Sequence, residues 1–194
     1  QSGDIPGARA HLQGMRRQYH AERVRLYRAE ADILVRAEQL EDAVSVYDGA
    51  LAELPSNSDL LYARAMVAAR QGNVVELERD LRVILNREPE NADALNALGY
   101  TLTDKTDRHE EALGLIERAF ALKPNDHYIV DSMGWVLHRL GRNDEALVHL
   151  RRAFELNGDA EVAAHLGEVL WAAGRRDEAR EIWRDALERE PDAD

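Results

Sequence analysis

Histidine and acidic residues are the side chains of this sequence whose chemistry suits metal binding or proton transfer. Zinc-binding motifs usually place paired ligands about two to five residues apart. Here His138 and His149 are 11 residues apart, and His165 lies further along the chain. Glu110 and Glu111, which follow His109, lie at an expected helix start, where acidic side chains interact favourably with the helix dipole. The sequence therefore predicts no metal site and no cofactor.

Nucleophilic catalysis has equally little support. The sequence contains no cysteine, and the segment around Ser132, DSMGW, lacks the flanking glycines of a hydrolase nucleophile motif. The glycine-rich patterns of nucleotide-binding and dinucleotide-binding proteins do not occur, and neither does the HExxH zinc pattern. We therefore expect no catalytic residues and no enzyme activity in this chain.

The charge pattern excludes one class of partner. Acidic residues outnumber basic residues 37 to 25, and the net charge is −12. Because nucleic-acid binding depends on clustered Lys and Arg, no nucleic-acid partner is expected. Residues 1–36 are different, since they contain seven Arg and four acids. Three interpretations of this arginine-rich segment stay open: a solvated helix face, a surface for an acidic partner, or a surface that packs on preceding repeats.

A repeat with a period near 34 residues organises the chain. Similar phrases end at four prolines and one glycine, namely Pro55, Pro89, Pro124, Gly158 and Pro191. Each phrase follows a segment with a small residue on a helical face, at Ala31, Ala65, Gly99, Gly134 and Gly167. Gly72, Gly141 and Gly174 mark chain reversals between the two patterns. Two helices per period are therefore predicted, with Asn125 or Asp126, and Asn143 or Asp144, as N-caps.

This pattern resembles the tetratricopeptide repeat (TPR). One copy runs through Met133–Gly134, Leu137, Ala146, Leu150 and Ala153, and another through Leu98–Gly99, Leu102, Ala112, Ile116, Ala119 and Pro124. The copy that begins at residue 58 departs most, because Arg64–Ala65 replaces Leu–Gly and Leu77 replaces the usual Ala. The resemblance implies an all-α fold, a superhelical solenoid of antiparallel helix pairs.

The predicted organisation is a single solenoid over residues 1–194. Residues 1–22 match the second helix of a truncated repeat, and the full copies are 24–57, 58–91, 92–126, 127–159 and 160–194. The third copy has an extra residue in the turn between its helices. Because a half-repeat leaves an apolar face uncovered, we expect further repeats before residue 1 and self-association through exposed solenoid ends.

In the TPR family, certain positions of each first helix face the concave groove. These positions predict a partner-binding surface at Tyr62, Asn96, Tyr100, Tyr128, Asp131, Trp135, His138, His165 and Trp171. Aromatic side chains with a polar tip are suited to recognition. The alternative for each aromatic residue is packing between helices, and the alternative for Asp131 is a local cap or pair. Of the Lys, Asn and Arg residues of the carboxylate clamp in TPR co-chaperones, only Asn96 has a counterpart here, which argues against such a clamp.

Residues 92–191 resemble a narrower group, the outer-membrane TPR lipoproteins of proteobacteria. This group includes the adaptor of a carboxyl-terminal processing protease. The resemblance implies a periplasmic adaptor that binds the protease and presents substrates such as peptidoglycan hydrolases. A lipid anchor, which this chain does not contain, is the only membrane attachment expected. Three alternatives stay open: a scaffold in another envelope or secretion assembly, a regulatory segment of a larger enzyme, and a cytoplasmic location.

Overall fold

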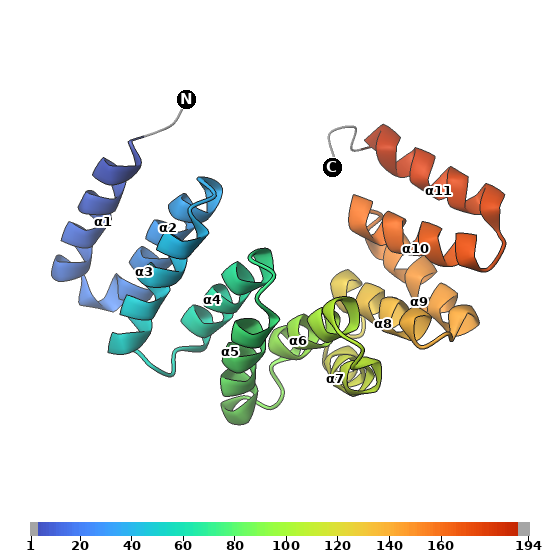
Figure 1. The fold of residues 1–194 in the computed structure, drawn as a ribbon, viewed down its shortest axis with the longest axis horizontal. Coiled ribbons are helices and arrows are strands. Elements are labelled where there is room, and N and C mark those ends of the chain that lie inside the picture. Colours follow the sequence, from blue (N-terminus) through green and yellow to red (C-terminus); the bar gives the residue numbers. More distant parts are fainter. Residues whose placement is uncertain (1–3, 190–194) are drawn as a thin grey trace. The chain divides into compact units, whose positions relative to one another are not determined.

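The computed structural model of the protein describes residues 4–189, and its regular elements are helices (Figure 1). The prediction of an all-α chain is therefore confirmed. A 3-10 turn at His20–Glu22 separates the first two α-helices. The α-helices are α1 (Ile5–Gln18), α2 (Arg23–Arg36), α3 (Leu40–Glu53), α4 (Ser58–Arg70), α5 (Val74–Arg87), α6 (Ala92–Lys105), α7 (His109–Leu122), α8 (His127–Arg139), α9 (Asn143–Leu156), α10 (Ala160–Ala172) and α11 (Arg176–Arg189).

The chain forms two compact units, an N-terminal unit of residues 1–89 and a C-terminal unit of residues 90–194. In the N-terminal unit α1 packs on α2, and the pairs α2–α3 and α4–α5 stack on one another. In the C-terminal unit the pairs α6–α7, α8–α9 and α10–α11 stack in the same way. None of the described helices is long and apolar enough to cross a membrane.

Short polar side chains start most of the first helices. The side chains of Asn57, Asn91, Asp126 and Asp159 each accept a hydrogen bond from a backbone N–H in the first turn of the following helix. The expected cap at Asn143 or Asp144 is wrong. Helix α9 begins at Asn143, and Arg142 at the N-cap position makes no side-chain cap; the Asn143 carboxamide oxygen instead lies 2.7 Å from Nδ1 of His138.

Tight turns join the helices of each pair. Gly72, Gly141 and Gly174 have φ angles of 70°, 78° and 78°, a left-handed conformation that favours glycine. Glu38 occupies the corresponding turn of the α2–α3 pair with a φ of 58°. The α6–α7 turn is different, since Thr106 is extended there, in keeping with its extra residue.

Close approach of paired helices explains the small residues. A Cβ atom added to Gly134 would lie 2.5 Å from Cγ of Leu150, and one added to Gly99 would lie 2.6 Å from Cγ1 of Ile116. One added to Gly167 would meet the Trp183 ring. The second helices thus pack directly on the backbone of the first helices, and Leu150 and Ile116 are fully buried there.

A polar contact closes four of the pairs at the end opposite their turn. In each contact the two residues are 30 positions apart, although the chemistry differs from pair to pair. The contacts are Arg23 with Glu53, Ser58 with Glu88, Asp93 with Lys123, and His127 with Asn157. The shared spacing shows that the repeat geometry, rather than one residue type, sets this connection.

Glu30 is a buried acid at a position that is apolar in the C-terminal unit. It precedes the small residue Ala31, as Leu98, Met133 and Leu166 precede theirs. Its carboxylate accepts hydrogen bonds from Arg9, Gln13 and Arg16 of α1. Burial favours the neutral acid, but these three bonds outweigh it and lower the pKa of Glu30. Arg9 and Arg16 therefore attach α1 to α2, a role that none of the three interpretations of the arginine-rich segment included.

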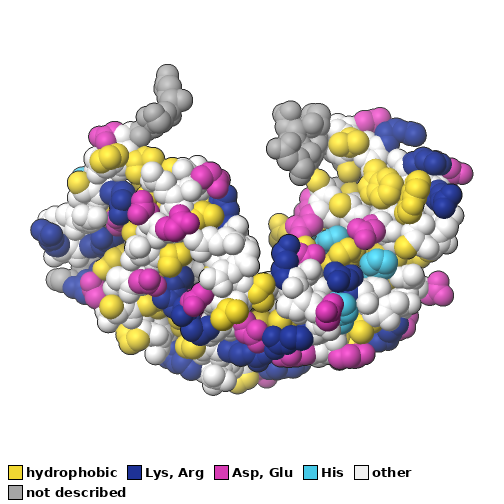
Figure 2. Space-filling view, viewed as in Figure 1, with side chains coloured by type: hydrophobic (Ala, Val, Ile, Leu, Met, Phe, Trp, Pro, Cys, Tyr) yellow, Lys and Arg dark blue, Asp and Glu magenta, His cyan; other side chains and the backbone are white. Residues whose placement is uncertain are grey.

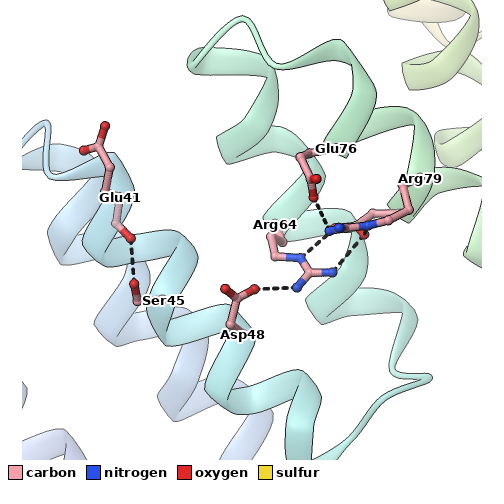
Figure 3. A network of polar contacts seen from close by, with 7 residues as sticks. Glu41, Ser45, Asp48, Arg64, Glu76 and Arg79 are labelled. Carbon is pink, nitrogen blue, oxygen red and sulfur yellow. Dashed lines mark hydrogen bonds and ion pairs between the residues drawn. The ribbon is translucent and has the colours of Figure 1, made fainter.

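Arg64 is the second charged residue at this position. Its guanidinium lies beside Asp48 of α3 (Figure 3) and also binds the carboxylate of Asp80 of α5. Two parallel hydrogen bonds, of 2.7 and 2.8 Å, join Arg64 to the buried Asp80. Arg79 donates a further bond of 3.0 Å to Asp80. The bidentate geometry is typical of a strong Arg–carboxylate pair and raises the pKa of Arg64.

Candidate functional site

Helices α6, α8 and α10 pack in succession and present one continuous face in the C-terminal unit. We call this the α6–α8–α10 face. Its side chains come from all three helices: Asn96 and Tyr100 of α6, Asp131, Trp135 and His138 of α8, and Glu161 and His165 of α10. Figure 2 shows histidine and acidic side chains close to hydrophobic ones on this unit.

Aromatic rings form the centre of the α6–α8–α10 face. The Trp135 and His165 rings are stacked, with centroids 4.3 Å apart and an interplanar angle of 17°. The ring centroid of His138 lies 5.4 Å from that of Trp135, on one side of the stack. The ring centroid of Tyr100 lies 6.1 Å from that of His165, on the other side. Trp135 is only 6% exposed, so it supports the face from beneath.

A buried His–Asp pair connects α10 to α8. Nδ1 of His165 lies 2.7 Å from Oδ2 of Asp131, which is 4% exposed. Burial opposes the charge of His165, but the hydrogen bond and the charge of Asp131 outweigh it, so the pKa of His165 is raised. Burial also raises the pKa of the Asp131 carboxyl. Asp131 thus pairs with the next repeat, which differs from the local cap or pair considered for it.

Tyr100 and Glu161 span the face from α6 to α10. The Tyr100 hydroxyl donates a hydrogen bond of 2.9 Å to Oε1 of Glu161. Burial, followed by the charge of Glu161, raises the pKa of Tyr100 well above its usual value. Sequence reasoning missed Glu161, although it occupies the same copy position as Tyr128, 33 residues earlier. That equivalence was the signal that would have identified it.

Three buried polar atoms of this face have no hydrogen-bond partner among the described residues. They are Oδ1 of Asn96, Oδ1 of Asp131 and Nε1 of Trp135. Leaving a buried donor or acceptor unpaired costs about 1–3 kcal/mol. Two unpaired acceptors and one unpaired donor therefore lie just beneath this face, and each needs an explanation.

The remaining predicted residues lie apart from this centre. Tyr128, at the start of α8, is 56% exposed and lies against His127, with ring centroids 3.9 Å apart. Trp171, which is 41% exposed, contacts α11 through Trp183, Arg176 and Arg180. Tyr62 belongs to α4 of the N-terminal unit and is half-buried. Its assignment to a partner surface stays a prediction.

The rim of the face is acidic. Glu161 and Glu168 of α10 are exposed, and Asp104 of α6 is half-buried. Glu168 lies 3.9 Å from Nε2 of His138. Among the described residues, no three His, Cys, Asp or Glu side chains are grouped so that they could hold a metal ion. Carboxylates beside aromatic rings are instead suited to cationic and hydrogen-bond-donating groups.

The family model described as tetratricopeptide repeat matches residues 8–191, which is most of the chain. The chain belongs to the tetratricopeptide repeat family. The expected TPR solenoid is therefore confirmed, and the chain is a scaffold of the kind that binds protein or peptide partners.

Relatives of this TPR chain are mostly much longer than it is. A TPR repeat-containing protein of Pseudomonas aeruginosa is 44% identical over 167 residues, which cover 86% of this chain and 28% of that protein. The human protein O-mannosyl-transferase TMTC1 is 28% identical over 158 residues, 79% of this chain and 18% of the transferase. The chain thus spans less than a third of the length of either relative.

Solved TPR structures share the fold. A thermophilic TPR protein of Thermus thermophilus has a TM-score of 0.73 and 26% identity, over 84% of this chain and 89% of that one. YrrB, a TPR protein described as having an unusual peptide-binding site, has a TM-score of 0.64 and 25% identity over 93% of each chain. A TPR protein of Parabacteroides merdae, at 17% identity, has a TM-score of 0.79 over 95% of this chain and 73% of that one.

The His165–Asp131 pair predicts a pH-dependent stability. Because the folded-state pKa of His165 is raised, its stabilising contribution is complete below the ordinary histidine pKa of about 6.5 and is lost as the pH rises through the raised value. In Asp131→Asn, the hydrogen bond and the charge that raise the His165 pKa most are removed while burial still opposes the charge of His165, so this contribution is largely lost. We expect the stability difference between the wild type and Asp131→Asn to shrink as the pH rises from about 6 to about 8.5.

Urea unfolding followed by circular dichroism at several pH values measures this difference. His149, whose pKa burial lowers, is present in both chains, so its titration cancels. The neighbouring Glu161 and Glu168 also act on His165 in both chains. A difference that stays constant or grows over this pH range would show that the Asp131 carboxylate does not raise the His165 pKa.

Proposed function

We propose that the chain is the peptide-binding part of a periplasmic adaptor. In this proposal the α6–α8–α10 face holds a substrate protein, such as a peptidoglycan hydrolase, and the adaptor presents it to a carboxyl-terminal processing protease. The whole protein is attached to the outer membrane by a lipid anchor outside this chain. The adaptor itself performs no chemistry.

The observation that carries the binding site is the set of unpaired polar atoms in an acidic and aromatic face. The acceptors of Asn96 and Asp131 are suited to N–H groups of a peptide backbone or of Arg and Lys side chains. Glu161 and Glu168 add negative charge at the rim. The segment that the face holds is therefore a basic one, and the Tyr100–Glu161 bridge opens to admit it.

Two further arguments support the adaptor. Residues 92–191 resemble the lipoprotein adaptors of carboxyl-terminal processing proteases, and a TPR protein of Pseudomonas aeruginosa is 44% identical to most of the chain. An adaptor without catalytic groups accelerates proteolysis because tethering raises the local concentration of a weakly bound substrate.

A regulatory segment of a larger enzyme is the second candidate function. It is favoured by two relatives whose names denote transferases, the human TMTC1 and protein arginine N-methyltransferase 9, which match this chain over 18% and 10% of their lengths. In that case the same face binds a segment of its own polypeptide. This candidate is favoured if the chain binds neither an envelope hydrolase nor the protease.

The test compares a variant that loses two carboxylates from the α6–α8–α10 face with a variant that loses two carboxylates elsewhere in the C-terminal unit. Glu161→Gln combined with Glu168→Gln removes two exposed carboxylates from the rim, and Glu117→Gln combined with Glu155→Gln removes two exposed carboxylates from α7 and α9. We expect the first variant to weaken binding of a purified peptidoglycan hydrolase about tenfold, because charge-assisted hydrogen bonds are lost. The control is expected to bind like the wild type.

Fluorescence anisotropy measures hydrolase binding, and gel-based degradation assays with the purified protease measure delivery. Trp135 is left unchanged, because truncation of this buried ring also removes packing. Equal binding by both variants would refute the location of the site. Wild-type binding without faster degradation would refute the adaptor role and leave the peptide site in place.

A further inference from the structure

A polar pocket of about 720 Å³ lies in the N-terminal unit, between the end of α1, the start of α2 and the end of α3. A volume in the range of about 300–1,000 Å³ is typical of ligand sites. Its lining consists of Gln13, Arg16, Arg17, Arg23, Tyr27 and Glu53. The pocket thus collects three of the seven arginines of residues 1–36, which the α6–α8–α10 face does not use.

Part of this lining is held rigidly in place. Arg16 donates to the buried carboxylate of Glu30, and its guanidinium stacks 4.0 Å above the Tyr27 ring. The Tyr27 hydroxyl donates a bond of 2.8 Å to Glu53, which also pairs with Arg23. Contacts between the lining side chains thus orient Arg16 and Tyr27 before a ligand enters the pocket, which lowers the entropy cost of binding.

Arg17 supplies the charge that is not neutralised. It is exposed on α1, and none of its contacts with another described residue is an ion pair or a hydrogen bond. Arg16 is paired with Glu30 and Arg23 with Glu53, so Arg17 gives the pocket one unpaired positive charge. The pocket is consequently cationic in a chain whose net charge is −12.

We propose that this pocket binds an acidic segment of a polypeptide partner, with an Asp or Glu carboxylate on Arg17 and a second contact on Arg23. Guanidinium groups bind carboxylates in a planar, bidentate geometry. The volume exceeds what one small anion fills, and the Tyr27 ring offers area to the side chains beside the carboxylate. The proposal is independent of the α6–α8–α10 face, whose acidic rim repels such a segment. The chain therefore carries two sites for segments of opposite charge.

The experiment uses the full chain and a fluorescein-labelled decapeptide rich in Asp and Glu. A peptide with Asn and Gln in their place is the ligand control. Arg17→Gln removes the unpaired charge, and Arg25→Gln is the matched control, because Arg25 lies on α2 outside the pocket and its side chain is 84% exposed. We expect Arg17→Gln to weaken binding of the acidic peptide about tenfold and Arg25→Gln to leave it nearly unchanged.

Competition with inorganic phosphate at matched ionic strength distinguishes a peptide site from a simple anion site. The proposal is supported if sodium glutamate displaces the peptide and if phosphate does not displace it at a lower concentration than glutamate does. Equal loss of affinity in Arg17→Gln and Arg25→Gln, equal binding of the neutral peptide, or stronger binding of phosphate than of the peptide would overturn it. The Glu161→Gln, Glu168→Gln variant is expected to bind the acidic peptide normally, so failure of the adaptor proposal leaves this result unaffected.

Discussion

Replacement of Asp80 by alanine is expected to lower the free energy of unfolding of the N-terminal unit by about 3–5 kcal/mol. Asp80 is buried, and its carboxylate receives the bidentate pair of bonds from Arg64 as well as a bond from Arg79. Without Asp80, the Arg64 guanidinium stays largely covered and loses its main partner. The guanidinium then keeps only the exposed carboxylate of Asp48, and breaking a buried pair is far more costly than the loss of a surface pair.

Asp48→Ala is the matched control for this prediction. Asp48 binds the same guanidinium at 2.5 Å, but its side chain is 58% exposed. Exposed ion pairs contribute about 0–1 kcal/mol, so the control is expected to stay within that range. Urea unfolding followed by circular dichroism provides both values. Similar losses in the two variants would show that Arg64 does not depend on its buried partner.

Gly134→Ala is expected to lower the free energy of unfolding of the C-terminal unit by about 2–3 kcal/mol. The added methyl group would lie 2.5 Å from Cγ of Leu150 and 3.1 Å from the backbone oxygen of Ala146. Leu150 is fully buried, so any shift of its side chain must displace packed neighbours. The α8–α9 pair must therefore separate to make room for one carbon atom.

Gly114→Ala is expected to raise the free energy of unfolding of the C-terminal unit. Gly114 is an exposed residue within α7, and a Cβ atom there meets no other atom within 4 Å. Alanine favours the helical conformation over glycine by about 1 kcal/mol, so this variant should be more stable than the wild type. Thermal unfolding of both variants by calorimetry measures the two shifts. A Gly134→Ala chain as stable as Gly114→Ala would show that the α8–α9 pair tolerates a wider spacing.

Charged residues that interrupt the apolar pattern affect how the repeats of this chain stack on one another. Glu30 and Arg64 stand where the C-terminal unit has Leu98, Met133 and Leu166. Each is matched by partners on the helices packed beside it, namely α1 for Glu30 and both α3 and α5 for Arg64. A buried charge that finds its partner in only one arrangement favours that arrangement over other stackings of similar repeats.

The sequence by itself determined the helix pairs of this protein. Period, small residues and turn glycines are local signals, and each is decided by contacts within one repeat, as between Gly134 and Leu150. The same register also placed Asn96, Tyr100, Asp131 and Trp135 on one face, because equivalent positions of stacked repeats face the same way. The helix pairs follow from spacing, and the choice of these groove positions follows from the resemblance to the TPR family.

Only the tertiary structure decided which side chains of that face meet. The His165–Asp131 contact joins residues 34 positions apart, and the Tyr100–Glu161 contact joins residues 61 positions apart across an intervening helix. The partners of Glu30 lie on α1, a helix outside its own pair. Contacts of this kind depend on how far each helix is displaced and rotated against the next, and on which rotamers the packing allows. The repeat period contains neither quantity.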